Sequence, residues 1–324
     1  MTGALNLCSC GFSTWGSDLG GFLGWPEPAV YIRWTQFGCF SPLMRCHGRT
    51  PREPWNYGDA ALANYKFHAW VRENLLDYIY SAAMEAHETG VPMMRSLAVT
   101  YPQELPLAAI HDEYMFGGDL LVAPVLDENN FRTVYFPAGR WTSLWDGKTV
   151  PGPAKITLYV PLNLIPVYLK AGTMLPVRLS PTLMFGESMS HGRVNALAMT
   201  PPSEKQTRSW FIAKAEGRQA ERKNPPEEKQ TRSSLTGQVG EAEAVLRPTP
   251  DGFDLTLRDH PEIDYLVIYD LHAGAVSADG HVLRQLQNAP YASMPPGWCA
   301  DSSLNRMVIR LPAGQATREV KLKF

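Results

Sequence analysis

The sequence has little excess charge of either sign and no long hydrophobic run. Its 324 residues include 30 Lys and Arg against 32 Asp and Glu, which leaves a formal net charge of −2. Without a basic excess, we expect neither a nucleic-acid partner nor binding to an anionic membrane surface. Charged residues interrupt the apolar stretch over 62–86, so no run reaches the ~18 residues that a membrane-spanning helix needs. These absences predict a soluble protein.

Cysteine is scarce, and the N-terminus has no secretory signal. The five cysteines are an odd number without the spacing of a disulfide framework, which favours free thiols in a reducing compartment. No second Cys or His pair follows Cys8 and Cys10 at zinc-site spacing, so no metal site is expected, and no motif calls for another cofactor. Residues 1–8 lack a basic segment and a small-residue cleavage site. We therefore expect a cytoplasmic protein.

What the chain does contain divides into three regions. The first, 1–90, has two amphipathic helices, at about 28–40 and about 59–88, separated by turn signals. Asp59 suits the positive end of the second helix, and Gly90 suits a left-handed position just after its last turn. Apolar residues make up 44% of the chain, with 27 prolines and 26 glycines, as in a globular, loop-rich protein of more than one domain.

The second and third regions are rich in strand patterns. Residues 91–179 hold β-branched and aromatic runs between Pro and Gly turns, which predict an antiparallel β-sandwich with strands at 97–101, 120–125, 133–136, 157–160 and 167–169. Residues 180–324 predict a distal β domain with strands at 244–247, 253–257, 263–269, 307–311 and 319–322. A polar insertion at about 200–235 carries a near-repeat of 201–209 at 225–233, which is typical of a surface loop.

Two segments of the first region could carry chemistry. A serine nucleophile elbow would need glycine where Trp15 stands, and the glycines around it lack the spacing of a phosphate loop. The remaining interpretation is a strand that presents Asp18 at its carboxyl end, where α/β active sites lie. An equally good alternative is that Asp18 caps the next turn while Trp15 packs in the core. His47 alone is more often structural than catalytic, and Arg45 could be a buried ion-pair partner.

Taken together, these segments resemble glycoside hydrolase family 31, the α-glucosidases, α-xylosidases and their relatives. The order and spacing of the matching segments agree over about residues 5–178. The segments are FSTWGSDLGGF at 12–22, YIRWTQFG at 31–38, SPLMRCHG at 41–48, PW at 54–55, VPMMR at 91–95, YMFGGDLLVAPV at 114–125, YFPAGRW at 135–141 and PVYLKAG at 166–172.

The resemblance implies a fold and a reaction. The fold would be an α/β part, the last two βα units of a (β/α)₈ TIM barrel in 1–90, followed by β-sandwich domains at 91–179 and 180–324. The reaction would be retaining hydrolysis of terminal α-linked glucosyl or xylosyl residues, for which two carboxyls lie about 5–5.5 Å apart. The family's signatures for the nucleophile and the acid/base aspartate do not occur in this sequence. We therefore expect no catalytic residue, and no measurable glycosidase activity, in these 324 residues alone.

The same resemblance assigns substrate-holding positions. Asp18 and His47 would hydrogen-bond the hydroxyls of the sugar that is cleaved off, while Trp15 and Phe22 would form the apolar wall. A carboxylate and an imidazole give directional bonds to hydroxyls, and an aromatic face packs against the C–H surface of a pyranose. The expected partners are an α-glucoside or α-xyloside, together with the missing barrel portion or a second copy of the chain. The alternative is a non-catalytic protein that binds carbohydrate or another subunit.

Overall fold

The structure is a computed structural model, and it describes residues 1–202, 208–213, 241–259, 263–271, 274–287, 290–313 and 317–323. No side chain is described for 208–213 or for 241 and 242. Most of the predicted polar insertion, including the greater part of both copies of the near-repeat, therefore lies outside the described residues. Across the described ranges the strands form four sheets, one of two strands, one of five and two of six.

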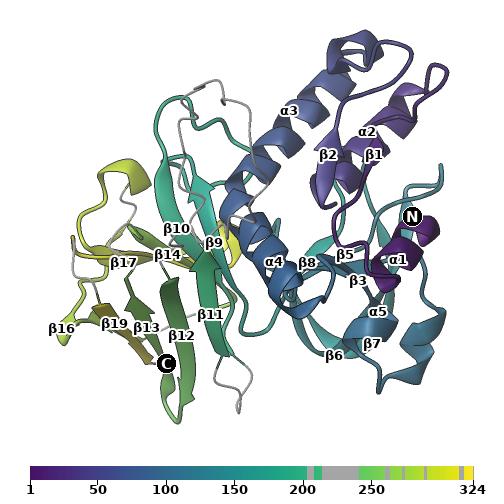
Figure 1. Ribbon diagram of the computed structural model, residues 1–324. Helices are drawn as coiled ribbons and strands as arrows, with labels where there is room; N and C mark the ends of the chain where they lie inside the picture. Colours follow the sequence, from purple (N-terminus) through teal and green to yellow (C-terminus); the bar gives the residue numbers. More distant parts are fainter. Residues whose placement is uncertain are drawn as a thin grey trace, which may run out of the picture.

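The first region alternates short parallel strands with helices, as the resemblance implied. After a short N-terminal helix, each strand leads into a helix that packs beside it (Figure 1). The elements are α1 (Thr2–Ser9), β1 (Gly16–Asp18), α2 (Pro28–Cys39), β2 (Leu43–Arg45), the 3-10 helix η1 (Pro54–Tyr57), α3 (Asp59–Asn74) and α4 (Leu76–Thr89). The expected helix at 28–40 and the parallel βα arrangement are confirmed.

The long helix expected at 59–88 is instead two helices, α3 and α4, which meet at Leu75. The apolar spacing continues across the break, so the sequence pattern gives no sign of it. At the break, the side-chain amide of Asn74 donates to the carbonyl of Arg178 (2.7 Å) and accepts from the backbone N–H of Gly186 (2.9 Å). These contacts join the end of α3 to two segments that are distant in the sequence. The ends agree with expectation, since α3 begins at Asp59 and Gly90 takes the left-handed conformation after α4.

The second region forms one six-stranded antiparallel sheet in the order β3-β4-β5-β8-β6-β7. Its strands are β3 (Met94–Ser96), β4 (Tyr114–Phe116), β5 (Leu120–Val122), β6 (Phe131–Ser143), β7 (Thr149–Tyr159) and β8 (Val167–Lys170), with the 3-10 helix η2 (Leu105–Ala109) between β3 and β4. The strand expected at 97–101 is wrong, because this segment is the short helix α5 (Leu97–Thr100). Ser96 explains the difference: its hydroxyl caps the helix by accepting the N–H of Val99.

The third region is a β-sandwich. One sheet has the order β17-β18-β14-β10-β9 and the other β11-β12-β13-β19-β15-β16. The first contains β9 (Met174–Leu179), β10 (Val194–Met199), β14 (Tyr265–Tyr269), β17 (Gly297–Asp301) and β18 (Arg306–Arg310). The second contains β11 (Arg208–Ala213), β12 (Glu241–Thr249), β13 (Gly252–Arg258), β15 (Ala275–Ala278), β16 (His281–Val282) and β19 (Thr317–Lys323). In the first sheet, β17 is flanked by two 3-10 helices, η3 (Tyr291–Ser293) and η4 (Ser302–Leu304).

Apolar side chains of both sheets fill the space between them, among them Leu197 and Ile268 from one sheet and Phe253 and Leu255 from the other. Each of the five strands expected in this region overlaps an observed strand: those at 244–247, 253–257 and 319–322 lie within β12, β13 and β19, while those at 263–269 and 307–311 extend one or two residues beyond β14 and β18. Strand pairing changes from the proximal sheet to the sandwich before β9, because β9 hydrogen-bonds to β10. The predicted domain limits at 90 and 179 stay predictions.

Helices α3 and α4 lie between the two halves of the molecule (Figure 1). Asp77 on α4 forms an ion pair with Arg178 on β9, which joins the helices to the sandwich. Arg33 on α2 donates to the carbonyls of Val160 (2.8 Å) and Leu164 (2.7 Å), which join the helices to the loop before β8. These contacts hold the two parallel strands at the end of the molecule away from the distal sandwich.

Candidate functional site

The two parallel strands place Asp18 and Arg45 side by side at their carboxyl ends. In the register of the pair, Asp18 stands opposite Arg45. The Asp18 carboxylate lies 2.7 Å from Nε of Arg45, with the aspartate side chain 13% exposed and the arginine side chain 57% exposed. The suggestion that Arg45 takes part in an ion pair is therefore confirmed, but the pair is half open to solvent instead of buried. The sequence alone did not indicate Asp18 as its partner.

The turn after Asp18 depends on glycine. Gly20 and Gly21 have φ angles of +77° and +86°, a conformation that side chains with a Cβ rarely adopt. A Cβ on Gly20 would also lie 2.8 Å from a carbon of Pro26. The backbone N–H of Gly21 donates to the carbonyl of Asp18 (2.9 Å). The chain therefore leaves β1 in a tight turn that brings Phe22 back beside the strand ends.

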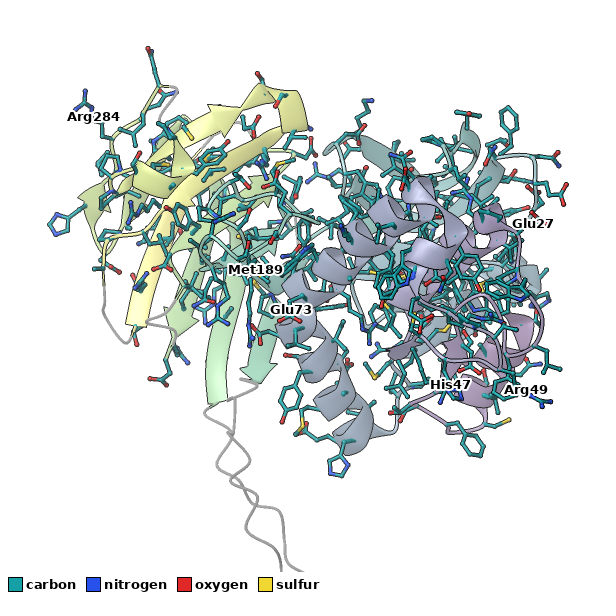
Figure 2. The ribbon with its side chains drawn as sticks, turned by 90° about the horizontal axis from the view of Figure 1, so that it is seen from above. Glu27, His47, Arg49, Glu73, Met189 and Arg284 are labelled. Carbon is teal, nitrogen blue, oxygen red and sulfur yellow. The ribbon has the colours of Figure 1, made fainter. Side chains whose placement is uncertain are left out.

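His47 and Phe22 meet beyond these strand ends. Their ring centroids are 5.6 Å apart with the planes tilted by 42°, and both side chains are exposed. The N–H of Arg49 donates to the carbonyl of Phe22 (2.8 Å), so the loop after β2 is joined directly to the loop after β1. Figure 2 shows His47 and Arg49 together on the helical part, far from Arg284 of the sandwich. Asp18, Arg45, Phe22 and His47 thus belong to one rim.

Trp15 lies apart from that rim. It precedes the first residue of β1, so it is at the opposite end of the strand from Asp18. Its indole N–H donates to Sγ of Cys8 (3.0 Å), and its ring lies 6.1 Å from that of Phe37. The side chain is half-buried against the main core. The structure therefore places three of the four predicted sugar-binding residues at the carboxyl ends of the parallel strands or in the loops just beyond them, and it directs Trp15 toward α1 and α2.

Arg52 is a residue of this region that the sequence did not single out. Its side chain is only 3% exposed, and its guanidinium donates to the carbonyls of Gly21 and Gly24, each at 2.8 Å. The sequence signal for Arg52 is its place between the matched segments at 41–48 and 54–55. Its burial, which is unusual for a charged residue, is visible only in the fold. The carbonyls of Gly21 and Gly24 are 31 and 28 residues away from it along the chain, and no sequence pattern reveals such a contact.

A large change in the pKa of a carboxyl group lies away from the rim. Burial raises the pKa of Glu113, next to β4, to about 8, although it accepts the N–H of Tyr135 and lies 3.3 Å from the guanidinium of Arg132. Closer to the rim, on α3 beside Cys46, burial raises the pKa of Tyr65 to about 12. The buried carboxyl belongs to the packing of the proximal sheet, so it is no candidate for sugar chemistry.

Among the described residues, no group of three or more His, Cys, Asp and Glu side chains is arranged to hold a metal ion. Within the same ranges, no helix is long and apolar enough to span a bilayer. All five cysteines are free thiols. The cytoplasmic location expected from the sequence stays a prediction.

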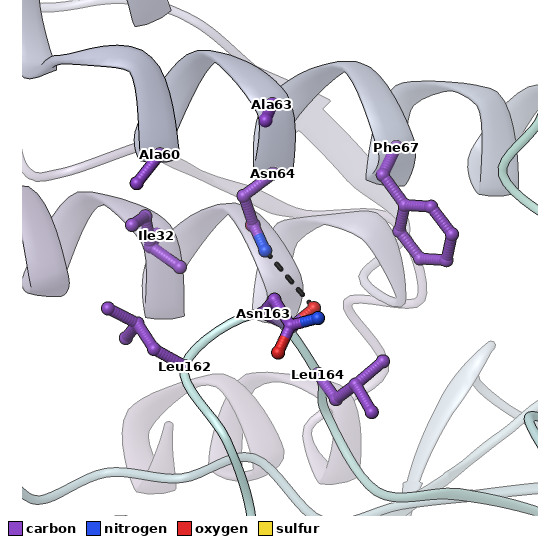
Figure 3. Close-up of a pocket in the computed structure, with 8 residues that line it drawn as sticks. All are labelled: Ile32, Ala60, Ala63, Asn64, Phe67, Leu162, Asn163 and Leu164. Carbon is purple, nitrogen blue, oxygen red and sulfur yellow. Dashed lines mark hydrogen bonds between the residues drawn. The ribbon is translucent and has the colours of Figure 1, made fainter.

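A cavity of about 350 Å³ lies between α2, α3 and the loop before β8 (Figure 3). Its walls are mostly apolar, and the amide of Asn64 crosses it to donate to the carbonyl of Asn163 (3.2 Å). The lining residues are Ile32, Ala60, Ala63, Asn64, Phe67, Leu162, Asn163 and Leu164. None of the four predicted site residues is among them, so this cavity is not the candidate site.

Two domain models of one family match consecutive parts of the chain. The model "Glycosyl hydrolases family 31 TIM-barrel domain" matches residues 1–82, and the model "Glycosyl hydrolase family 31 C-terminal domain" matches residues 90–175. Together they cover more than half of the chain, and they agree with the parallel βα part and the proximal sheet that follows it.

Curated relatives match the same half of the chain. An isomaltosyltransferase of Sporosarcina globispora is 33% identical over 206 residues, which are 59% of this chain and 19% of that protein. An alpha-xylosidase of Emericella nidulans is 34% identical over 186 residues, 55% of this chain and 24% of that protein. The chain thus spans about a fifth of the length of the curated relatives it matches.

Solved structures resemble a larger part of the chain. A cycloalternan-forming enzyme of Listeria monocytogenes, in complex with a pentasaccharide substrate, superposes with a TM-score of 0.84 at 24% identity, covering 99% of this chain and 30% of that one. That likeness shows the fold, including the distal sandwich. A family 31 alpha-xylosidase from a soil metagenome, complexed with xylose, has a TM-score of 0.50 at 33% identity, covering 52% of this chain and 29% of that one.

Proposed function

Because the chain belongs to glycoside hydrolase family 31, we propose that its two parallel strands supply sugar-holding groups of a retaining α-glycosidase. The observation that carries the proposal is the common rim at the carboxyl ends of β1 and β2, where Asp18 pairs with Arg45 and, in the loops that follow, Phe22 packs beside His47. Active sites of TIM barrels lie at this edge. The substrate class is a terminal α-linked glucoside or xyloside, as in the relatives called alpha-glucosidase and alpha-xylosidase.

The chemistry of the rim supports a holding role for Asp18. Its carboxylate is next to a guanidinium, and the six residues of β1 and β2 include no second carboxyl. Retaining hydrolysis needs two carboxyls on opposite sides of the bond that breaks. Asp18 and His47 offer an acceptor and a ring nitrogen to sugar hydroxyls, while Phe22 offers an apolar face. We propose that the nucleophile and the acid/base aspartate come from polypeptide outside these 324 residues.

Titration of the purified chain with glucose, xylose and maltose in a calorimeter tests this proposal. We expect weak binding that falls about tenfold in Asp18→Asn and in His47→Gln, because each loses a hydrogen bond to a hydroxyl. Arg45 is more than half exposed, so water can solvate its guanidinium when the ion pair is lost in Asp18→Asn. His87→Gln, at an exposed position near the end of α4, is the matched control and leaves the affinity unchanged.

The same preparation is assayed on nitrophenyl α-glucoside and α-xyloside. We expect no turnover, since no pair of catalytic carboxyls is placed at the rim. Turnover abolished by Asp18→Asn would identify Asp18 as the nucleophile and overturn the proposal. Binding that is insensitive to both rim substitutions would favour the alternative of a carbohydrate-binding or subunit-binding protein with its site elsewhere.

A further inference from the structure

We infer that Arg52 is a positioning residue that fixes the loop carrying Phe22 against the loop carrying His47. The two rings of the rim come from different loops, and the spacing between them decides whether a sugar ring fits beside them. This inference rests on the proposed function for its consequence, but the geometry that carries it is independent of sugar binding.

Arg52 spans the loop after β1. Its Nε donates to the carbonyl of Gly21 and its Nη2 to the carbonyl of Gly24, each at 2.8 Å. These two carbonyls lie on either side of Phe22 and Leu23. The guanidinium therefore fixes both ends of the short segment that carries the Phe22 ring.

The same side chain packs against the loop after β2. A Cβ on Gly48, the residue directly after His47, would lie 3.0 Å from Nε of Arg52. Nη1 donates to the hydroxyl of Tyr57 (2.9 Å), and also to Oγ1 of Thr50. The carbonyl of Arg52 accepts the hydroxyl of Tyr31 (2.7 Å), which holds its backbone on α2. The guanidinium is thus fixed between the two loops.

The chemistry of these contacts points to geometry as the role of Arg52. The side chain is 97% buried, yet the partners described above are carbonyls and hydroxyls instead of carboxylates. A buried charge without an ionic partner is costly to desolvate, so simple stability is a poor reason for it. Five N–H groups in a planar fork can reach acceptors on both loops at once. A lysine ammonium at the same place cannot, because its donors radiate from one point.

The first test measures the geometry without sugar. The ring protons of His47, assigned by comparison with His47→Gln, carry a ring-current shift from Phe22, and Phe22→Ala shows the value without it. We expect Arg52→Lys and Arg52→Ala to move the His47 signals toward the Phe22→Ala position. Millimolar guanidinium should restore them in Arg52→Ala but not in Arg52→Lys, where the side chain still fills the site.

The matched control is Arg33→Lys. Arg33 also donates to several carbonyls, but those carbonyls belong to the loop before β8. This variant should lose stability without moving the His47 signals. If the His47 signals stay in place in folded Arg52→Lys and Arg52→Ala, or move equally in Arg33→Lys, the inference is wrong.

The second test asks whether the spacing matters to the sugar. We expect maltose affinity to fall about tenfold in Arg52→Lys, and guanidinium to bring Arg52→Ala within about twofold of the parent. Displaced ring signals with unchanged maltose affinity would overturn the role of this spacing in sugar binding. A parent chain that binds no sugar would refute the proposed function, while the ring signals would still decide the positioning role.

Discussion

At the scale of single residues, the rim combines groups whose types suit a sugar and whose partners are set by the fold. Asp18 and His47 were predicted from local motifs, and both lie at the carboxyl ends of the parallel strands or just beyond them. The ion pair of Asp18 with Arg45 and the bonds of Arg52 depend on which strands and loops become neighbours. A motif can therefore single out a candidate side chain without showing what holds it in place.

His68 predicts a pH dependence of stability. It lies in α3 with no solvent exposure, and burial lowers its pKa from 6.5 to about 4. Its Nδ1–H donates to the carbonyl of Asn64 (3.0 Å), which opposes this change in pKa, but burial is the larger effect and the folded protein holds the neutral ring near neutral pH. As pH falls below 6.5, the unfolded chain takes up this proton first, and stability is lost until pH falls through about 4.

We expect this group to remove about 2 kcal/mol from the free energy of unfolding between pH 7.5 and pH 5. Urea denaturation at those two values measures the loss. His68→Asn can keep the bond to Asn64 without titrating, so its stability should change less over the same interval, whereas exposed His87→Asn should behave as the parent does. Equal losses in the parent and His68→Asn would contradict the assignment.

At the scale of elements, helices and strands were predicted well where one face is buried. The predictions failed where a polar side chain bonds to backbone groups near the end of an element. At the break between α3 and α4, the Asn74 side chain bonds to the backbone of β9 and of the loop after it, more than a hundred residues away. The helix at 97–100 follows from the Ser96 cap, which outweighs the β-branched composition of the segment. Periodicity registers neither the two bonds of Asn74 nor the cap of Ser96.

The packing of α2 on β1 predicts a sharp effect at Gly38. A Cβ there would lie 2.6 Å from Cδ2 of Leu19, which directly follows β1 and is fully buried, so the Leu19 side chain would have to shift within packed surroundings. Gly38→Ala should cost about 1–2 kcal/mol in the free energy of unfolding, since overpacking exceeds the gain in helix propensity.

Gly3→Ala is the matched control, because Gly3 lies in α1 and a Cβ there meets nothing within 4 Å. It should be neutral or stabilising by up to about 1 kcal/mol. Urea denaturation compares the two variants with the parent. Loss of stability in Gly3→Ala, or none in Gly38→Ala, would show that the close approach of α2 does not constrain this position.

At the scale of the whole molecule, apolar surface gathers on the part that carries the parallel strands. Large hydrophobic side chains at least 60% exposed there include Phe12, Leu23, Trp25 and Trp55. The described strands of this part form a sheet of only two, whereas a TIM barrel closes with eight. Open strand edges beside exposed apolar side chains favour association with another polypeptide.

We expect the purified chain to self-associate as its concentration rises, and sedimentation velocity measures this. Trp25→Ser with Trp55→Ser should reduce the association. Leu105→Ser with Val282→Ser, at side chains that are 80% and 82% exposed elsewhere, should not. Added salt should not dissolve the aggregates, because apolar contacts are not screened as charges are. A chain that stays monomeric over this range would contradict the prediction.

The sequence by itself determined the family, the two parallel βα units and most strands, because motifs and alternating burial are local properties of the chain. It also singled out Asp18, His47 and Phe22 as candidate site residues, because the motifs that contain them can be read without the fold. Only the tertiary structure decided that Asp18 faces Arg45, that Trp15 turns toward Cys8, and that β9 joins the distal sandwich. Those outcomes depend on which distant segments become neighbours, and contacts between distant segments leave no periodic trace in the sequence.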